Sequence, residues 1–229
     1  MQAIIMAAGT GTRLRPLTMD TPKPLLKLGD QTIIEKTLSN LPQAVNEVFV
    51  IIGHHGDKIE KFIGANYKNL KINYLWQKEL KGTWHAASLA KDHLRGAFLV
   101  LNGDDIYKKD DLEKLAQHPW SVMAQKFNEA TDTLDSLVLD QDGRLCDVVE
   151  KNDPGEKIVN TGAYSLKPEF FDHAPIAIKD GKEYGLPQTL AKVCQLYPVQ
   201  VVFTDDWHKI NTLQDLERAR KIVAKVVAN

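Results

Sequence analysis

Cysteine is scarce in this chain, and long apolar runs are missing. Only two of the 229 residues are cysteine, Cys146 and Cys194, and their wide separation without a Cys-x-x-Cys pair favours free thiols over a disulfide framework. No apolar run approaches the roughly 18 residues that a membrane-spanning helix needs, and no signal peptide precedes the first apolar run. These absences predict a cytoplasmic protein that does not insert into a membrane.

An excess of charge of either sign is also lacking. The 29 Lys and Arg residues balance 30 Asp and Glu residues, which leaves a formal net charge of −1 at pH 7. A chain with that balance has no overall field that would attract nucleic acid or an anionic membrane, so neither is expected as a partner. Any basic binding site must be local.

Two common phosphate-binding motifs are absent as well. A dinucleotide fingerprint that starts at Gly9 would need glycine where the chain has Leu14, and no Gly-Lys-Ser/Thr ends a Walker A loop. The histidines are scattered, and no metal-ligand spacing links the neighbours His54 and His55 to other histidines or to a cysteine. Structural or surface roles are expected for them rather than a zinc site.

Short apolar runs alternate with helical patterns in the first half of the chain. Four compact runs have the composition of parallel strands buried on both faces, and they cover residues 3–6, 48–52, 72–76 and 98–101. Helical patterns cover residues 57–67 and 82–94, and another helix opens with a capping box formed by Thr32 and Glu35. The alternation predicts an α/β fold with a doubly wound, mostly parallel, Rossmann-like sheet and helices on both faces.

The second half of the chain has a different pattern. Four more strand-like runs follow with few helical patterns between them, at residues 121–127, 136–140, 146–150 and 158–166. One helix is predicted at residues 184–196, and a last helix opens at Thr212, with Asp215 as its capping partner, and ends near residue 227. We therefore expect a single domain over residues 1–229 in which a β-rich insertion follows the parallel sheet.

The stretch after the first strand carries the clearest chemistry. Gly9 and Gly11 let backbone N–H groups approach phosphate oxygens, and Arg13 adds a fork of donors suited to phosphate. Pro22 and Pro24 hold Lys23 on an extended segment. Each feature alone is more often a tight turn or a solvated loop. Together, at the carboxyl end of a first strand where open α/β sheets bind ligands, they predict a polyphosphate site.

This stretch resembles the signature of the sugar-1-phosphate nucleotidylyltransferases, the pyrophosphorylases that make nucleotide sugars. Between Ala8 and Leu25 the chain has every part of it: Ala-Gly-x-Gly-x-Arg-Leu, Pro-Leu-Thr and Pro-Lys-Pro-Leu. Weaker matches continue to the last helix. The resemblance implies that Arg13 and Lys23 contact the triphosphate at the reacting α-phosphate. It also implies that the nucleotide is bound by the surrounding residues, which are Ala7, Ala8, Gly9, Gly11 and Thr12.

A later segment, Trp76 to Ala90, resembles the part of the family that reads the base. Gln77 and Gly82 would take that role, and Thr83 would complete the nucleotide site. Gly82-Thr83 would also suit a plain helix entry, and the neighbouring Trp and His depart from the small residues usual in the family.

The magnesium site implied by the resemblance consists of Asp104 and Asn211. A carboxylate at the carboxyl end of a buried strand, as Asp104 is, can hold Mg²⁺ and would be catalytic together with Arg13 and Lys23. Many relatives have a second acidic ligand where this chain has Lys209, and others use an asparagine two positions later, which is Asn211. Lys209 is expected to point away from the ion, and Asp105 is expected to be a helix-cap or surface residue.

The resemblance also implies a sugar-phosphate site. Glu150 and Lys151 match a Val-x-Glu-Lys-Pro motif whose glutamate contacts sugar hydroxyls, although Asn152 replaces the proline. Asn160 matches a sugar-contacting asparagine, and Asn102 is assigned to the same site.

These residues predict a magnesium-dependent nucleotidyltransferase acting on a sugar 1-phosphate, with pyrophosphate as the second product. About residues 1–115 would bind the nucleotide, and about residues 116–229 would bind the sugar and contribute the C-terminal helix. The Ala-Ala-Gly at positions 7–9, common among uridylyl- and cytidylyltransferases, and the Gly-Thr at positions 82–83 favour UTP. The chain ends soon after its last helix, so a stand-alone member without an acyltransferase domain is expected.

Two alternatives stay open. A cytidylyltransferase acting on phosphocholine or another non-sugar phosphate would share the opening motif, but such enzymes usually lack the Gly-Thr segment. A non-catalytic nucleotide-sensing module would bind the nucleotide without transferring any part of it. Lys209, at a position where many relatives have an acidic metal ligand, keeps that alternative open.

Overall fold

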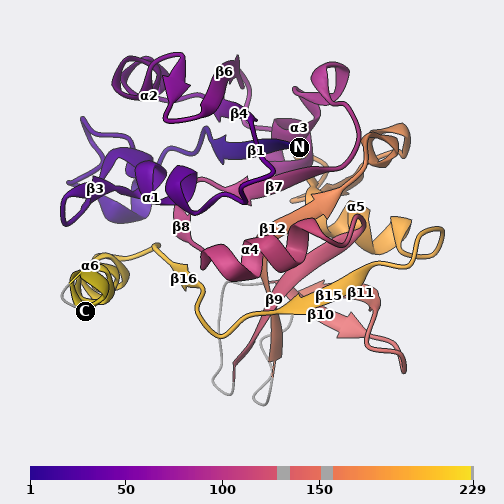
Figure 1. Cartoon of the computed structure of the whole chain (residues 1–229). Coiled ribbons are helices and arrows are strands. Elements are labelled where there is room, and N and C mark those ends of the chain that lie inside the picture. The colour runs from indigo at the N-terminus through magenta and orange to yellow at the C-terminus, as the bar shows by residue number, and fades with distance from the viewer. Residues whose placement is uncertain (128–134, 151–156, 228–229) are drawn as a thin grey trace.

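The parallel centre of the fold consists of four neighbouring strands. The computed structural model describes residues 1–127, 135–150 and 157–227, except for the side chains of Glu150 and of residues 225–227. The central strands lie in the order β7 (Phe98–Asn102), β1 (Gln2–Ala7), β4 (Glu47–Ile52) and β6 (Leu70–Trp76), and each neighbouring pair is parallel (Figure 1). The α/β class and the four predicted strands of the first half are therefore confirmed.

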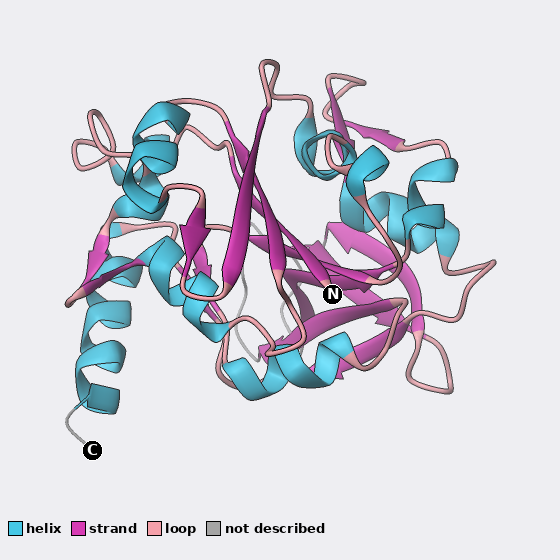
Figure 2. Cartoon of the chain, turned by 45° about the horizontal axis from the view of Figure 1, so that its top comes forward, coloured by secondary structure: helices cyan, strands magenta, loops and turns pink. Residues whose placement is uncertain are grey.

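Side chains on successive residues of the central strands point into different layers. In β1, Ala3 and Ile5 belong to one buried cluster and Ile4 to another, because successive residues of a strand face opposite sides of the sheet. The first cluster is covered by α1 (Ile33–Asn40), α2 (Gly56–Ile63) and α4 (Lys109–Ala116). The second is covered by α3 (Gly82–Ser88) and α5 (Leu186–Val193), so helices flank the sheet on both faces (Figure 2).

The second half of the chain extends the same sheet with antiparallel strands. The long strand β12 (Lys157–Leu166) pairs with β7 on one side, and β9 (Ser121–Phe127) and β10 (Asp135–Leu139) also pair with β12. The outer strands are β11 (Leu145–Glu150), which pairs with β10, and β15 (Gln200–Phe203), which runs parallel to β9. The predicted β-rich segment is thus continuous with the central sheet, which is mixed, with a parallel core.

Three predicted helices are shorter than their sequence patterns suggest. Residues 66–67 form β5 (Asn66–Tyr67), an edge strand antiparallel to β6, so α2 ends at Ile63. The helix α3 ends at Ser88 and a separate 3-10 turn follows at Lys91–His93. Tyr184 lies in β14 (Glu183–Gly185), which forms a hairpin with β13 (Ile176–Ile178), and α5 begins only at Leu186 because a proline in its first turn suits a helix start.

The C-terminal helix α6 (Leu213–Val227) packs against the N-terminal part of the chain. Its buried Leu216 and Ala219 belong to a cluster that includes Leu14 and Leu28, and α6 contacts β2 (Lys27–Leu28), which pairs with β3 (Gln31–Thr32). Figure 1 shows α6 at the lower left, below β3. The predicted cap is present: Asp215 Oδ2 accepts hydrogen bonds from two backbone N–H groups that precede the helix, those of Asn211 and Thr212, each at 2.9 Å. The packing of α6 therefore holds Asn211 near the opening loop.

Neither cysteine of the described residues is in a disulfide. Cys146 is exposed, Cys194 is half-buried, and the Cys194 thiol donates a hydrogen bond to the carbonyl oxygen of Cys146 at 3.3 Å. Within the described residues, no helix is long and apolar enough to cross a membrane.

Candidate active site

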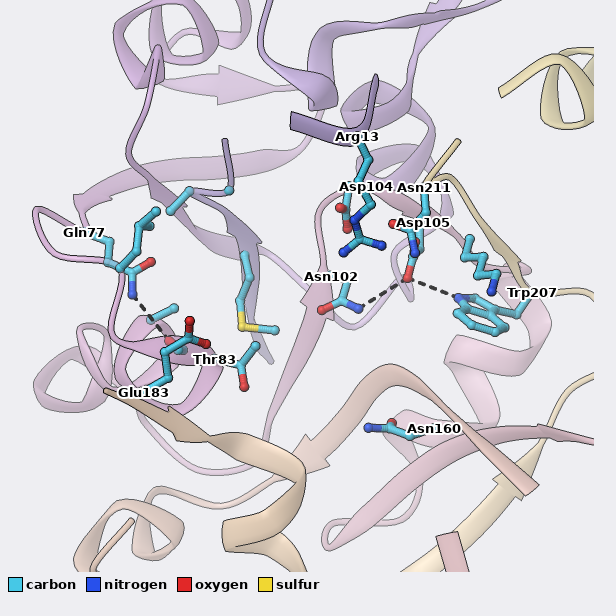
Figure 3. A pocket seen from close by; sticks show the side chains of 17 residues that line it. Arg13, Gln77, Thr83, Asn102, Asp104, Asp105, Asn160, Glu183, Trp207 and Asn211 are labelled. Carbon is cyan, nitrogen blue, oxygen red and sulfur yellow. Dashed lines mark hydrogen bonds between the residues drawn. The ribbon is translucent and has the colours of Figure 1, made fainter. Parts of the chain in front are cut away.

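A cavity of about 480 Å³ opens at the carboxyl ends of the central parallel strands, the edge where open α/β sheets bind ligands (Figure 3). It brings together side chains from segments far apart in the chain. Ten residues predicted to belong to the site line it, namely Ala8, Gly9, Arg13, Gln77, Gly82, Thr83, Asn102, Asp104, Asn160 and Asn211.

The opening loop places Arg13 at the cavity. A 3-10 turn (Thr12–Leu14) follows Gly11, and the side chain of Thr18 donates a hydrogen bond of 2.7 Å to the carbonyl oxygen of Gly11, which fixes the start of that turn. Leu14 is buried in the cluster with α6, whereas the guanidinium of Arg13 is exposed toward the cavity. Ala7, Gly11 and Thr12 belong to the same strand and loop but are not among the described residues that line the cavity.

Lys23 reaches the two predicted magnesium ligands. Its Nζ lies 2.5 Å from Oδ2 of Asp104 and 3.4 Å from Oδ1 of Asn211. The Lys23 side chain is only 7% exposed, and that of Asp104 is 38% exposed. One positive charge therefore already sits between a carboxylate and an amide oxygen, the ligand types that Mg²⁺ prefers, so the donor set fits a divalent cation.

Asp105 is not the cap or surface residue that the sequence suggested. It is 4% exposed, and its Oδ2 accepts hydrogen bonds from Trp207 Nε1 and Asn102 Nδ2, both at 3.3 Å. Its short strand β8 (Asp105–Ile106) pairs with β16 (His208–Lys209), which draws it beneath the cavity. Burial, together with the neighbouring charge of Asp104, raises the pKa of Asp105 to about 7.

Gln77 lies at the opposite end of the cavity from Asp104 (Figure 3), and Gly82, its hydrogen-bond partner, also lines the cavity. The side chain of Gln77 is buried and donates to the carbonyl oxygen of Gly82 at 3.3 Å, and its Nε2 lies 3.1 Å from His85 Nδ1. Burial lowers the pKa of His85.

Gly82 has a φ of +88°, and a Cβ there would lie 2.4 Å from the carbonyl oxygen of Tyr184, so β14 packs directly against this glycine. Thr83 Oγ1 accepts a hydrogen bond from the backbone N–H of Leu186 at 3.0 Å, which joins the start of α3 to the start of α5.

A second hollow of about 300 Å³ adjoins this cavity and shares Asn102 and Asn160 with it. Asn160 Nδ2 donates to the hydroxyl of Tyr164 at 2.7 Å, and its Oδ1 accepts from the backbone N–H of Gly162 at 3.0 Å. A Cβ on Gly162 would lie 2.0 Å from Asn102 Nδ2, so a larger residue at position 162 would clash with the Asn102 side chain. The side-chain amides of Asn102 and Asn160 each keep hydrogen-bonding capacity for a ligand.

The side chains of two predicted sugar-binding residues lie outside the described part of the structure. Lys151 is among residues 151–156, and Glu150 ends β11 with a side chain that is not described. Their contacts with the site stay predictions.

Four cavity residues have roles that the sequence did not reveal. Asp105 and Trp207 form the buried hydrogen bond beneath the cavity, and Glu183 lines it while making an ion pair with Lys179 at 2.9 Å. Lys209 lines the cavity from β16. A lone carboxylate and an isolated tryptophan carry no spacing signal. The pairing of β8 with β16 brings Asp105, Trp207 and Lys209 together, whereas Glu183 comes from β14.

A family model described as "Nucleotidyl transferase" matches residues 2–226. The bifunctional protein GlmU of Methanocaldococcus jannaschii is 32% identical over 174 residues, which cover 75% of this chain and 41% of that protein. The chain thus spans less than half the length of that relative. The UTP--glucose-1-phosphate uridylyltransferase AglF of Haloferax volcanii is 31% identical over 180 residues, which cover 75% of this chain and 74% of that protein.

The fold is also that of a solved structure. A crystal structure of a putative glucose-1-phosphate thymidylyltransferase from Bacillus anthracis, in complex with a sucrose, superposes with a TM-score of 0.86 at 20% identity. The superposition covers 97% of this chain and 94% of that chain, which supports the α/β architecture. The family match over nearly the whole chain confirms the resemblance seen in the opening motif, and this chain belongs to the nucleotidyl transferase family.

Proposed function

We propose that this chain transfers a nucleotidyl group from a nucleoside triphosphate to a sugar 1-phosphate, giving a nucleotide sugar and pyrophosphate. The observation that carries the proposal is the convergence of Arg13, Asp104 and Asn211 at one cavity, with the ammonium of Lys23 in contact with both Asp104 and Asn211. Two cationic side chains, with a carboxylate and an amide oxygen close by, are the groups that a triphosphate and a divalent cation require.

The acceptor needs no general base. A phosphate monoester has its second pKa at about 6, so it is mostly dianionic at neutral pH. One of its oxygens attacks the α-phosphorus, and a new P–O bond forms. The bond between the α-phosphorus and the oxygen that bridges to the β-phosphorus breaks, and the electron pair leaves with pyrophosphate. The protein has to align the two substrates and offset their negative charge.

The residues around the cavity have separate tasks in this reaction. Arg13 is exposed at the cavity and has no ion-pair partner among the described residues, so its donors are available to phosphate oxygens. Lys23 would place its ammonium against the α-phosphate. Asp104 and Asn211 would hold Mg²⁺, which supplies neutralisation of phosphate charge when it is bound.

UTP is the proposed donor. The Ala-Ala-Gly pattern at positions 7–9 and the Gly-Thr at positions 82–83 support this choice. The Haloferax volcanii relative, which has UTP in its name, supports it as well. The second hollow beside Asn102 and Asn160 supports a sugar acceptor, since amide groups with spare hydrogen-bonding capacity suit sugar hydroxyls.

Pyrophosphate release tests the proposal directly. UTP, CTP, dTTP and GTP are each combined with glucose 1-phosphate, N-acetylglucosamine 1-phosphate or phosphocholine, with and without Mg²⁺. We expect magnesium-dependent release with UTP and at least one sugar phosphate. Release only with CTP and phosphocholine would instead identify a cytidylyltransferase for a non-sugar phosphate. Nucleotide binding without release in any combination would indicate a sensing module.

A further inference from the structure

The ammonium of Lys23 occupies the position between the two predicted metal ligands. Its Nζ contacts Asp104 Oδ2 at 2.5 Å and Asn211 Oδ1 at 3.4 Å, although these residues lie 81 and 188 positions away in the chain. The contact with Asp104 is a charge-assisted hydrogen bond in a site where Lys23 is 7% exposed. It is therefore less screened by solvent than a surface ion pair.

The backbone around Lys23 holds the ammonium in place. Lys23 lies between two buried prolines and begins a 3-10 turn (Lys23–Leu25). The N–H of Leu26 donates to the Lys23 carbonyl oxygen at 3.0 Å. Proline fixes φ on either side, which leaves the segment few alternative conformations. The backbone of Asn211, whose side chain contacts the Lys23 ammonium, is fixed by the cap of α6, because its N–H donates a hydrogen bond to Asp215. Both partners are thus held before any ligand binds.

The free site offers a divalent cation little beyond these two oxygens. No group of three or more His, Cys, Asp or Glu side chains in the described part of the chain is arranged to hold a metal ion. The carboxyl group of Asp105, which follows Asp104 in the chain, is buried and accepts hydrogen bonds from Trp207 and Asn102. A divalent ion approaching Asp104 would also be repelled by the Lys23 ammonium.

We propose that Lys23 is the resident cation of this site in the free protein, and that the phosphates of the incoming nucleotide draw its ammonium away from Asp104 and Asn211. The freed oxygens then become available to the divalent cation that accompanies the triphosphate. This inference rests on the proposed nucleotide substrate. It makes metal and nucleotide binding mutually dependent, because each ligand must raise the affinity of the other by the same factor.

Manganese binding to the free protein tests the proposal without turnover. Free Mn²⁺ is measured by electron paramagnetic resonance during titration of wild-type protein and of Lys23→Met, which removes the charge and keeps most of the side-chain length. We expect Lys23→Met to bind Mn²⁺ at least about tenfold more tightly than wild type. Equal or weaker binding by Lys23→Met would overturn the proposal. Lys27→Met is the control, because Lys27 is exposed, and its ammonium donates to the carbonyl oxygen of Asp30 and lies over the ring of Phe62.

A second measurement uses the wild-type protein, so it does not depend on the folding of Lys23→Met. The NMR signal of the Lys23 ammonium, assigned with Lys23→Arg, is followed during titration with α,β-methylene UTP, whose α–β linkage cannot be cleaved. We expect that signal to shift with the analogue and to stay unchanged with Mg²⁺ alone. An unchanged signal at saturating analogue would mean that Lys23 does not move, which contradicts the proposal. Both measurements are independent of pyrophosphate release, so they distinguish failure of this inference from failure of the proposed reaction.

Discussion

The indole Nε1 of Trp207 donates a hydrogen bond to Oδ2 of the buried carboxyl of Asp105, 3.3 Å away, across a separation of 102 residues. This bond fastens β16 beneath the cavity that Asp104 and Asn211 line. The position of the candidate metal site therefore depends on a contact that none of its own ligands makes.

Trp207→Phe should lower the free energy of unfolding by about 1–3 kcal/mol, since it leaves a buried acceptor short of a hydrogen bond. Urea unfolding measures the change. Trp84→Phe is the matched control, because the buried Trp84 Nε1 has no hydrogen-bond partner among the described residues, so this replacement removes no such bond. If both variants lose the same free energy of unfolding, the loss comes from the smaller ring alone, and the hydrogen bond between Trp207 and Asp105 contributes nothing to stability.

Gly82→Ala should destabilise the protein more than Gly96→Ala. Both glycines have a positive φ, +88° and +83°, so both replacements carry backbone strain. Only at Gly82 would the new Cβ also meet the backbone of Tyr184, at 2.4 Å, whereas Gly96 has nothing within 4 Å. We expect an extra loss of about 1–3 kcal/mol, typical of overpacking, together with a raised KM for the nucleotide. Equal losses in thermal unfolding would show that β14 simply moves aside.

Arg13→Ala should lower kcat by about 100-fold or more, on the basis of the roughly 2.7–4 kcal/mol that one electrostatic donor contributes to a transition state. The melting temperature should barely change, because Arg13 is exposed. Arg15→Ala is the control, since Arg15 is exposed in the same loop and is not among the described residues that line the cavity. Turnover close to wild type in Arg13→Ala would remove this residue from the mechanism.

Substitutions at the candidate metal site should differ in kind. Asp104→Asn removes the charged ligand and should nearly abolish pyrophosphate release at any magnesium concentration. Asn211→Ala removes a neutral ligand, so excess Mg²⁺ should recover part of the lost rate. Lys209→Ala should leave the magnesium dependence unchanged. The assignment of Asn211 is wrong if Lys209→Ala alters that dependence while Asn211→Ala behaves as wild type.

Base selection should favour UTP over GTP by about tenfold or more in kcat/KM, roughly 1.4 kcal/mol or greater. Gln77→Ala should narrow that ratio, because the buried Gln77 side chain lies at the end of the cavity assigned to the base. Steady-state kinetics with each nucleotide gives both numbers. Equal use of GTP by the wild-type chain would contradict the assignment of UTP as the donor.

The sequence by itself determined the local elements and the family. The compact apolar run of β1 and the capping boxes at Thr32 and Thr212 depend on residues only a few positions apart, so their signals are complete within a short window. The opening motif holds its glycines, Arg13 and Lys23 within the fifteen residues from Gly9 to Lys23, so it could be recognised before any packing was known.

The tertiary structure alone decided how those parts meet. It placed Lys23 between Asp104 and Asn211, buried Asp105 beneath Trp207, and packed Tyr184 against Gly82. Such contacts join segments separated by about 80 to 190 residues, and the sequence near one partner contains no signal for the other. Their formation depends on strand pairing and on the packing of α6 across the opening loop, which are properties of the assembled sheet and core.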